Sequence, residues 1–341
     1  MSQSQVCYRL ALAVGALTYG TSLVRSRERK ERQLWANVLA CLLVLLTCLP
    51  VSAQQNTSTQ ALRTGEETDT SSSGTVSPTP TEQTSAADQA KEAANPLANI
   101  WLLQMQQNNW SVGQPVGGAR MQGNLQFQPL IPLPFSDHWH LVVRPVATLF
   151  NSAPYPNPNG TDNRVTRFGD TVFAFGLVPD RTLVGHWLLG AGPTFIFPTG
   201  HSYPLLSQNK WQFGPTFAVG YNAKRWLAYV FPQQWFPIGG NGRKTNQMLW
   251  EYSFIYTVGK WTVGTKADSF VNWQASAGNK LAFPVGPKIG RLMYAGILPV
   301  KVDLAFLYYA VRPSPAQFGQ KWGLQLEVTP IIPTLIKKKL L

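Results

Sequence analysis

The sequence has little cysteine, little charge and few long apolar runs. Its three cysteines, Cys7, Cys41 and Cys48, all lie within the first 53 of 341 residues. A chain cleaved after residue 53 would therefore hold no disulfide framework and no cysteine-based metal site. Charged residues make up only 13% of the sequence and aromatic residues 12%, which is unusual for a soluble enzyme of this length. We therefore expect much of the chain to contact something other than water.

Residues 34–49 form the only apolar stretch long enough to suggest a membrane-spanning helix. At 16 residues this stretch is shorter than the roughly 20 that a bilayer core requires. Five basic residues precede it within 25–32, and Ser52 and Ala53 follow it in a pattern that fits a signal-peptide cleavage site. We predict a signal peptide with a long n-region over 1–53 and export of the remainder. A retained anchor helix and a lipoprotein signal at Cys48 are the alternatives.

The formal net charge of +13 is unevenly distributed. Residues 54–95 hold two basic and six acidic side chains, whereas residues 96–341 hold 21 basic and eight acidic ones. The basic residues of the second region are scattered singly, except at 337–339, and nothing resembles a recognition helix. We therefore predict no nucleic-acid partner.

Composition separates the exported part into three regions. Residues 54–95 are rich in Ser and Thr with almost no large apolar residue, which predicts a disordered linker, with a short helix around 86–94 as an option. From residue 96 to 335 the chain consists of segments of roughly ten residues separated by Gly, Pro, Asn and Ser, as in membrane β-barrels. Residues 336–341 form a basic tail.

Within these segments, apolar and polar residues alternate with a period of two. Residues 210–221 show this most clearly, because Trp211, Phe213 and Phe217 alternate with Gln212, Thr216 and small residues. One face of such a strand is large and apolar while the other is small or polar, as the wall of a membrane barrel requires. The same pattern recurs at 124–131, 139–145, 247–257, 300–308 and 321–329.

The segments predict an all-β fold, a closed antiparallel transmembrane β-barrel of about twelve strands. Ten or fourteen strands, and a soluble β-sandwich or lipocalin-like barrel, are the alternatives. Tryptophans near the starts of six segments favour the membrane barrel, because such residues gather at membrane interfaces. The predicted strands lie near 99–107, 121–133, 138–150, 169–178, 185–197, 210–221, 225–236, 247–258, 260–273, 280–291, 298–310 and 321–332.

Several motifs resemble those of a known bacterial family. They include Gln-Pro-Leu-Ile-Pro-Leu-Pro at 128–134, Phe-Gly-Asp at 168–170, the Gly- and Pro-containing run at 190–200, and Phe-Pro-Val-Gly at 283–286. In their order they resemble the outer-membrane β-barrel family named meta-pathway phenol-degradation proteins, often mislabelled neuromedin U. The resemblance covers 96–333 and implies an outer-membrane channel for small, hydrophobic or aromatic solutes, without catalytic residues. One departure is the basic end at 337–341, where such barrels usually finish on an aromatic residue.

If the apolar faces contact lipid, the charged side chains of the strands line the lumen. Such residues either brace a narrow lumen through ion pairs, for example between Lys301 and Glu327, or select permeating solutes. Twelve strands predict a narrow lumen with slow conductance and, from the basic excess, a mild preference for anions. The predicted lumen-lining residues are Arg144, Glu251, Lys266, Asp268, Lys301, Asp303, Lys321 and Glu327.

Other chemistry is not predicted. The four histidines lack a serine on the same strand face, so we expect no enzyme, with a lipid hydrolase and a purely structural barrel as alternatives. His138 and His140 have no ligand set beyond Asp137 to complete a metal site, and no cofactor is expected. The expected partners are outer-membrane lipid, the barrel-assembly machinery and an unidentified small solute, in the outer membrane of a Gram-negative cell. Residues 151–168 and 198–209 are the predicted long extracellular loops.

Overall fold

The computed structural model describes residues 85–114, 118–155, 163–180, 184–200, 206–315, 318–332 and 339–340. The predicted signal peptide and residues 54–84 of the predicted linker lie outside the described residues. No helix of the described part is long and apolar enough to cross a membrane. The elements are α2 (Ala86–Glu92), β1 (Trp101–Val112), β2 (Arg120–Pro134), β3 (Trp139–Tyr155), β4 (Asn163–Phe168), β5 (Thr171–Pro179), β6 (Trp187–Phe197), β7 (Trp211–Asn222), β8 (Trp226–Gly239), β9 (Gln247–Val258), β10 (Trp261–Asn272), β11 (Leu281–Val285), β12 (Lys288–Ala295), β13 (Leu298–Val311) and β14 (Gln320–Ile332).

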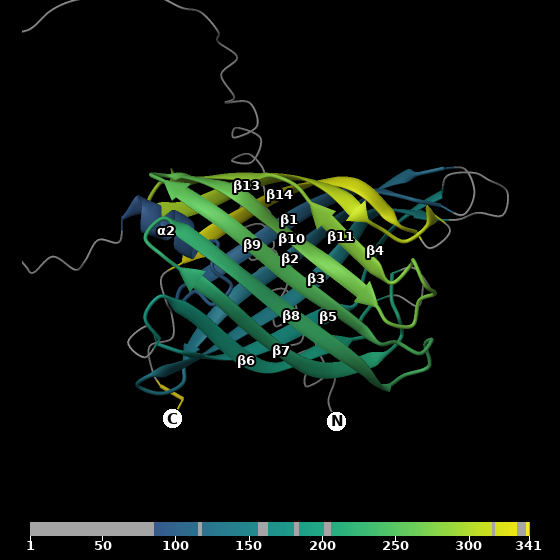
Figure 1. The fold of residues 1–341 in the computed structure, drawn as a ribbon, viewed down its shortest axis with the longest axis horizontal. Helices are drawn as coiled ribbons and strands as arrows, with labels where there is room; N and C mark the ends of the chain where they lie inside the picture. The colour runs from purple at the N-terminus through teal and green to yellow at the C-terminus, as the bar shows by residue number, and fades with distance from the viewer. Residues whose placement is uncertain are drawn as a thin grey trace, which may run out of the picture. The chain divides into compact units, whose positions relative to one another are not determined.

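The strands form one closed antiparallel barrel, which confirms the predicted fold class (Figure 1). Apart from β4 with β5 and β11 with β12, consecutive strands of the chain pair with one another, and β1 pairs with β14 to close the sheet. Two positions in the wall are each occupied by two short strands. β4 and β5 both pair with β3 and are separated by Gly169 and Asp170, while β11 and β12 both pair with β10 and β13 and are separated by Gly286 and Pro287. The fourteen strands therefore occupy twelve wall positions.

Side chains alternate strictly between the two faces of the wall in β7. Trp211 and Phe217 on its outer face are 48% and 50% exposed, whereas Gln212 and Thr216 on its inner face are 1% and 3% exposed. The large apolar residues of β9, β10, β13 and β14 are exposed in the same way. A soluble β-sandwich or a lipocalin-like barrel turns its apolar face inward. The outward apolar face excludes both alternatives and suits contact with lipid.

Aromatic side chains gather at both ends of this exposed surface. Trp139, Trp187, Trp226 and Trp261 begin β3, β6, β8 and β10, which all start at the same end of the barrel. At the other end, Trp211 begins β7, and the exposed Trp273 follows β10. Two such girdles are typical of barrels that cross a bilayer, because indole rings prefer the interface.

The connections at the two ends differ. At one end, which we call the short-turn end, the strands are joined by residues 135–138, 180–186, 223–225, 259–260 and 296–297. The opposite end, which we call the long-loop end, is where β1, β3, β6, β8, β10 and β13 finish. The predicted long loop over 151–168 is wrong in extent, because β3 continues to Tyr155 and β4 begins at Asn163. Pairing of these strands extends the wall beyond its neighbours there.

The segment before β1 packs into the barrel at the short-turn end. Ala90 and Ala98 are fully buried, and with Leu97 they contact inward-facing residues such as Leu227 and Ile255. A helix of seven residues is too short to be stable alone, so α2 depends on this packing. The prediction of a short helix near 86–94 is confirmed, but the assignment of residues 86–95 to a disordered linker is wrong. Its small side chains look like low complexity in the sequence, yet they fit the narrow space inside the barrel.

Part of the basic tail returns to the same end. The Leu340 amide donates a hydrogen bond to the Pro134 carbonyl at 3.0 Å, and Lys339 forms an ion pair with Asp137 in the turn after β2. This ammonium group holds the pKa of Asp137 below its usual value. Both side chains are exposed, so the pair contributes little to stability.

Candidate functional site

Three layers of the barrel interior lie along β14 between the long-loop end and the short-turn end. Gln325 lines a cavity, Glu327 belongs to a cluster of charged side chains, and Ile331 packs with the segment before β1. We call these layers the cavity, the charged cluster and the plug, the last being residues 86–98. β13 runs the opposite way and meets the charged cluster at Lys301 and then the cavity at Leu307.

The charged cluster is built from inward positions of six strands. It consists of Arg144 on β3, Glu251 on β9, Lys266 on β10, Lys288 on β12, Lys301 and Asp303 on β13, and Glu327 on β14. Residues 96–341 contain eight acidic side chains, and the only four within described strands are Asp268 and the three carboxylates of this cluster. The alternation of the strands therefore collects the acidic side chains of the described strands on the lumen side.

Glu251 is the centre of one half of the cluster. Arg144 Nη2 lies 2.9 Å from Glu251 Oε2 and also donates to Gln128 at 2.8 Å. The Tyr229 hydroxyl donates to Glu251 Oε1 at 2.5 Å, and Lys266 Nζ lies 3.8 Å from the same oxygen. Both oxygens of this buried carboxylate are thus neutralised by partners from other strands, as a buried charge requires.

The other half of the cluster connects Glu327 and Asp303 through lysines. Lys288 Nζ donates to Glu327 Oε2 at 3.1 Å and lies 3.8 Å from Asp303, while Lys266 Nζ reaches the same Glu327 oxygen at 3.5 Å. Lys301, which is fully buried, donates to both oxygens of Asp303 at 2.7 and 2.9 Å. Lys266 contacts both Glu251 and Glu327, so the two halves form one continuous network.

Two details of the sequence prediction are wrong. Lys301 pairs with Asp303 on its own strand rather than with Glu327, because the register places Lys301 opposite Thr329 and Asp303 opposite Glu327. Lys321 is exposed and does not join the cluster. An irregularity in the pairing of β1 with β14 skips Lys321, since Ser111 faces Trp322 and the next residue, Val112, faces Gln320. The other predicted lumen residues lie inside the barrel, with Asp268 at the edge of the cavity.

Sequence reasoning missed Tyr229 and the interior of β8. Leu227, Tyr229 and Phe231 face inward, while Trp226 and Val230 on the same strand face outward. Both faces of β8 are apolar, so its sequence gives no polarity signal for the inner face. Tyr229 belongs to the site because the pairing of β8 with β9 brings it next to Glu251. The centre of the Phe231 ring lies 5.6 Å from the Arg144 guanidinium carbon.

Gly290 provides the space that the Lys288 and Asp303 pair occupies. A side chain at this position of β12 would overlap the Asp303 carboxylate and the Thr262 hydroxyl. We predict that Gly290→Ala destabilises the barrel by about 1 to 3 kcal/mol, because overpacking displaces a buried ion pair. Urea-induced unfolding in lipid vesicles measures this. Gly176→Ala is the matched control, since a Cβ at Gly176 meets nothing closer than 3.9 Å, and an equal loss in both variants would contradict the prediction.

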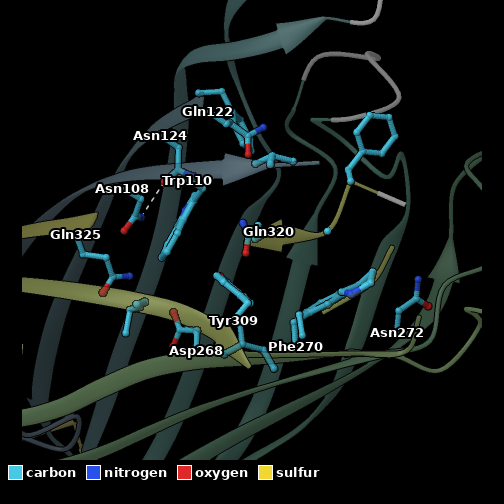
Figure 2. A pocket seen from close by; sticks show the side chains of 18 of the residues that line it. Asn108, Trp110, Gln122, Asn124, Asp268, Phe270, Asn272, Tyr309, Gln320 and Gln325 are labelled. Atoms are coloured by element: carbon cyan, nitrogen blue, oxygen red, sulfur yellow. Dashed lines mark hydrogen bonds between the residues drawn. The ribbon is translucent and has the colours of Figure 1, made fainter. Parts of the chain in front are cut away.

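The cavity has a volume of about 450 Å³ and lies between the charged cluster and the loops of the long-loop end (Figure 2). Its wall combines amides with aromatic rings. Trp110 and Tyr309 meet edge to face at 5.8 Å, and Gly323 on β14 leaves room for the Trp110 ring. The labelled wall residues are Asn108, Trp110, Gln122, Asn124, Asp268, Phe270, Asn272, Tyr309, Gln320 and Gln325.

Several amide side chains in and beside the cavity wall form hydrogen bonds with one another. Asn108 donates to Asn124 at 2.8 Å and accepts from Gln106 at 2.9 Å, while Gln128 donates to Gln126 at 2.8 Å. These bonds fix the side chains on β1 and β2. A wall that is fixed in advance and holds both apolar rings and polar groups is typical of small-molecule sites.

Within the described residues, no histidine forms a hydrogen bond with a serine or with another histidine. His140 Nδ1 lies 3.7 Å from Asp180 Oδ1, and His186 Nδ1 lies 3.1 Å from the Asn222 carbonyl oxygen. Within the described residues, no group of three or more His, Cys, Asp or Glu side chains is placed to hold a metal ion.

No protein-family model and no curated protein sequence matches this chain. The solved structures that it is similar to are outer-membrane barrels. The COG4313 outer membrane channel from Pseudomonas putida F1 aligns with a TM-score of 0.48 and 11% identity over 68% of this chain and 94% of that one. A Pseudomonas aeruginosa FadL homologue and the Ralstonia pickettii toluene transporter TbuX each align with a TM-score of 0.35, at 9% and 7% identity, over 71% of this chain and 92% of theirs. At these scores the similarities do not establish a shared family or function, and the resemblance to the phenol-degradation family stays a prediction.

Proposed function

We propose that this chain is an outer-membrane channel for small solutes that is closed at its short-turn end in the conformation described. The exposed apolar wall with its two aromatic girdles supports a position in a bilayer. Closed β-barrels cross membranes because every backbone group is paired within the wall. By the usual arrangement of such barrels, the long-loop end would face outward and the short-turn end the periplasm.

The cavity is the observation that carries this proposal. It offers about 450 Å³ on the side that would face the medium, with Trp110, Phe270 and Tyr309 for an apolar or aromatic part of a solute and amides for its polar groups. Below it, the charged cluster and the plug fill the lumen. A solute that enters the cavity can therefore pass only when those layers move.

The structure changes the expected ion preference. Lys and Arg outnumber Asp and Glu in the barrel region, which predicted a mild preference for anions. In the lumen, however, Arg144 and three lysines face Asp268 and the three cluster carboxylates, so their formal charges cancel. We therefore propose a channel without strong preference for either sign.

Planar-bilayer recording of the purified protein tests the proposal. We expect rare and small openings, well below those of a water-filled porin, with similar permeability to small anions and cations. Uptake of small aromatic compounds into proteoliposomes should accompany them. Electrical silence and absence of uptake, in the full chain and in a variant with the plug displaced, would leave a purely structural barrel.

A further inference from the structure

Asp268 differs from the other carboxylates of the lumen. Glu251, Asp303 and Glu327 each accept at least one bond from a lysine or arginine at 3.1 Å or less. Among the residues that the structure describes, none donates a hydrogen bond to the Asp268 carboxylate or forms an ion pair with it. Asp268 is half-buried on the cavity wall, so its carboxylate is left open to whatever occupies the cavity.

The position of Asp268 shows where a partner could come from. Lys266, two residues away on the same face of β10, points into the charged cluster and contacts Glu251 and Glu327. Asp268 instead lines the cavity, as Figure 2 shows, close enough to the Tyr309 phenol to interact with it electrostatically. Trp110 meets Tyr309 edge to face in the same wall. The open side of the carboxylate is therefore bordered by aromatic rings.

The cationic side chains nearest to Asp268 are paired with other carboxylates. Arg144 and Lys266 act on Asp268 at longer range, but their direct contacts are with Glu251 and Glu327. The other charged residue of the cavity wall is Lys280, which is exposed in the connection after β10, where water screens it. Inside the cavity Asp268 is thus the dominant local charge.

We propose that Asp268 binds the protonated amine of a small organic cation whose apolar part lies against Trp110 and Tyr309. A carboxylate accepts a charge-assisted hydrogen bond from an ammonium group, and aromatic rings attract the same cation through their π-electrons. This inference rests on the proposed function, because it names the class of solute that the cavity accepts. Neutral and anionic compounds of the same shape lack the group that Asp268 would bind.

Isothermal titration calorimetry on the folded, detergent-purified protein tests the proposal with three probes of similar shape. Benzylamine carries the cation, benzyl alcohol is neutral and benzoate is anionic. We expect the wild-type protein to bind benzylamine at least about tenfold more tightly than benzyl alcohol, and to bind benzoate most weakly. Asp268→Asn should remove this tenfold preference. Lys280→Gln is the control for the other charge of the wall and should not weaken benzylamine binding.

Three outcomes would overturn the inference: no benzylamine binding by the wild-type protein, equal binding of benzylamine and benzyl alcohol, or an unchanged preference in Asp268→Asn. The wild-type probe series decides the matter even if that variant does not fold. Calorimetry needs no ion current, so the result is separate from the proposed function. A conducting channel without preference for amines would refute only the solute class, whereas amine binding by a silent barrel would refute only transport.

Discussion

Displacing the plug is expected to convert a mostly silent barrel into a conducting one. Ala90 and Ala98 are fully buried among apolar side chains, so arginine at both positions would place two unpaired charges where only methyl groups fit. Such a burial costs several kcal/mol, and each 1.4 kcal/mol changes a population about tenfold. We predict that Ala90→Arg/Ala98→Arg raises the open fraction in planar bilayers by about a hundredfold or more.

The control for this prediction lies on the same helix. Asp88 is exposed, so Asp88→Arg adds a cation to α2 without burying it and should leave the recordings close to wild type. A cross-link supplies the opposite test. Cysteines at Leu97 and Gly190, whose positions are in contact, can be joined by a short bifunctional thiol reagent in a chain that has no other cysteine after residue 53. Currents that persist unchanged when the plug is cross-linked would show that the plug is not the barrier.

The plug buries little apolar area, which lowers the free energy needed to displace it. Four of its buried residues are alanines, each of which contributes little apolar area, and Leu97 is its single large apolar side chain. Polar contacts hold its edge, since Lys91 Nζ donates to the Ala223 carbonyl at 2.6 Å and the Tyr294 hydroxyl donates to Gln89 at 3.2 Å. Elements with few large apolar contacts open at lower free energy than the strands around them.

The barrel could be predicted from the sequence because its signal is local. The direction of a side chain in a strand depends on its own parity, so the alternation of Trp211 and Gln212 with their neighbours was enough to assign both faces of β7. The end of β1 was harder. The predicted strand ends at 107, but the amide of Asn108 faces the cavity and β1 continues to Val112.

The contacts of the charged cluster could not be predicted, because they depend on register and closure. Arg144 and Glu251 are 107 residues apart and meet across the lumen, which no strand-by-strand reading can foresee. The misplaced Lys321 shows the same limit, since one irregularity in the pairing of β1 with β14 removes it from the inner face. The packing of the plug could not be predicted for another reason. Its alanines are neither amphipathic nor strongly apolar, and only the finished barrel gives them a place to be buried.

The charged cluster connects six strands to one another at the middle of the lumen. Arg144 comes from β3 and Glu251 from β9 on the other side of the wall, so their bond crosses the barrel rather than following the sheet. Such a brace keeps the lumen narrow and forms the lower boundary of the cavity. A solute that moves from the cavity toward the plug must therefore pass between side chains that are already paired.

Removing one charge from this network is expected to have the largest effect on stability. Glu327 neutralises Lys288 at 3.1 Å and Lys266 at 3.5 Å, and its side chain is 5% exposed. We predict that Glu327→Gln lowers the free energy of unfolding by about 3 kcal/mol or more, because two lysines lose a buried counter-charge. Urea titration in lipid vesicles, followed by the gel mobility of the folded barrel, measures the loss.

Two further variants distinguish the network from a general effect of lumen polarity. Asp268→Asn removes a carboxylate that makes no ion pair and should cost about 1 kcal/mol or less. Lys288→Met introduced together with Glu327→Gln restores the balance of charge, so the double variant should be more stable than the sum of the two single losses predicts. If Glu327→Gln and Asp268→Asn were equally destabilising, or if the two substitutions were additive, the ion pairs would not be what holds the interior of the barrel together.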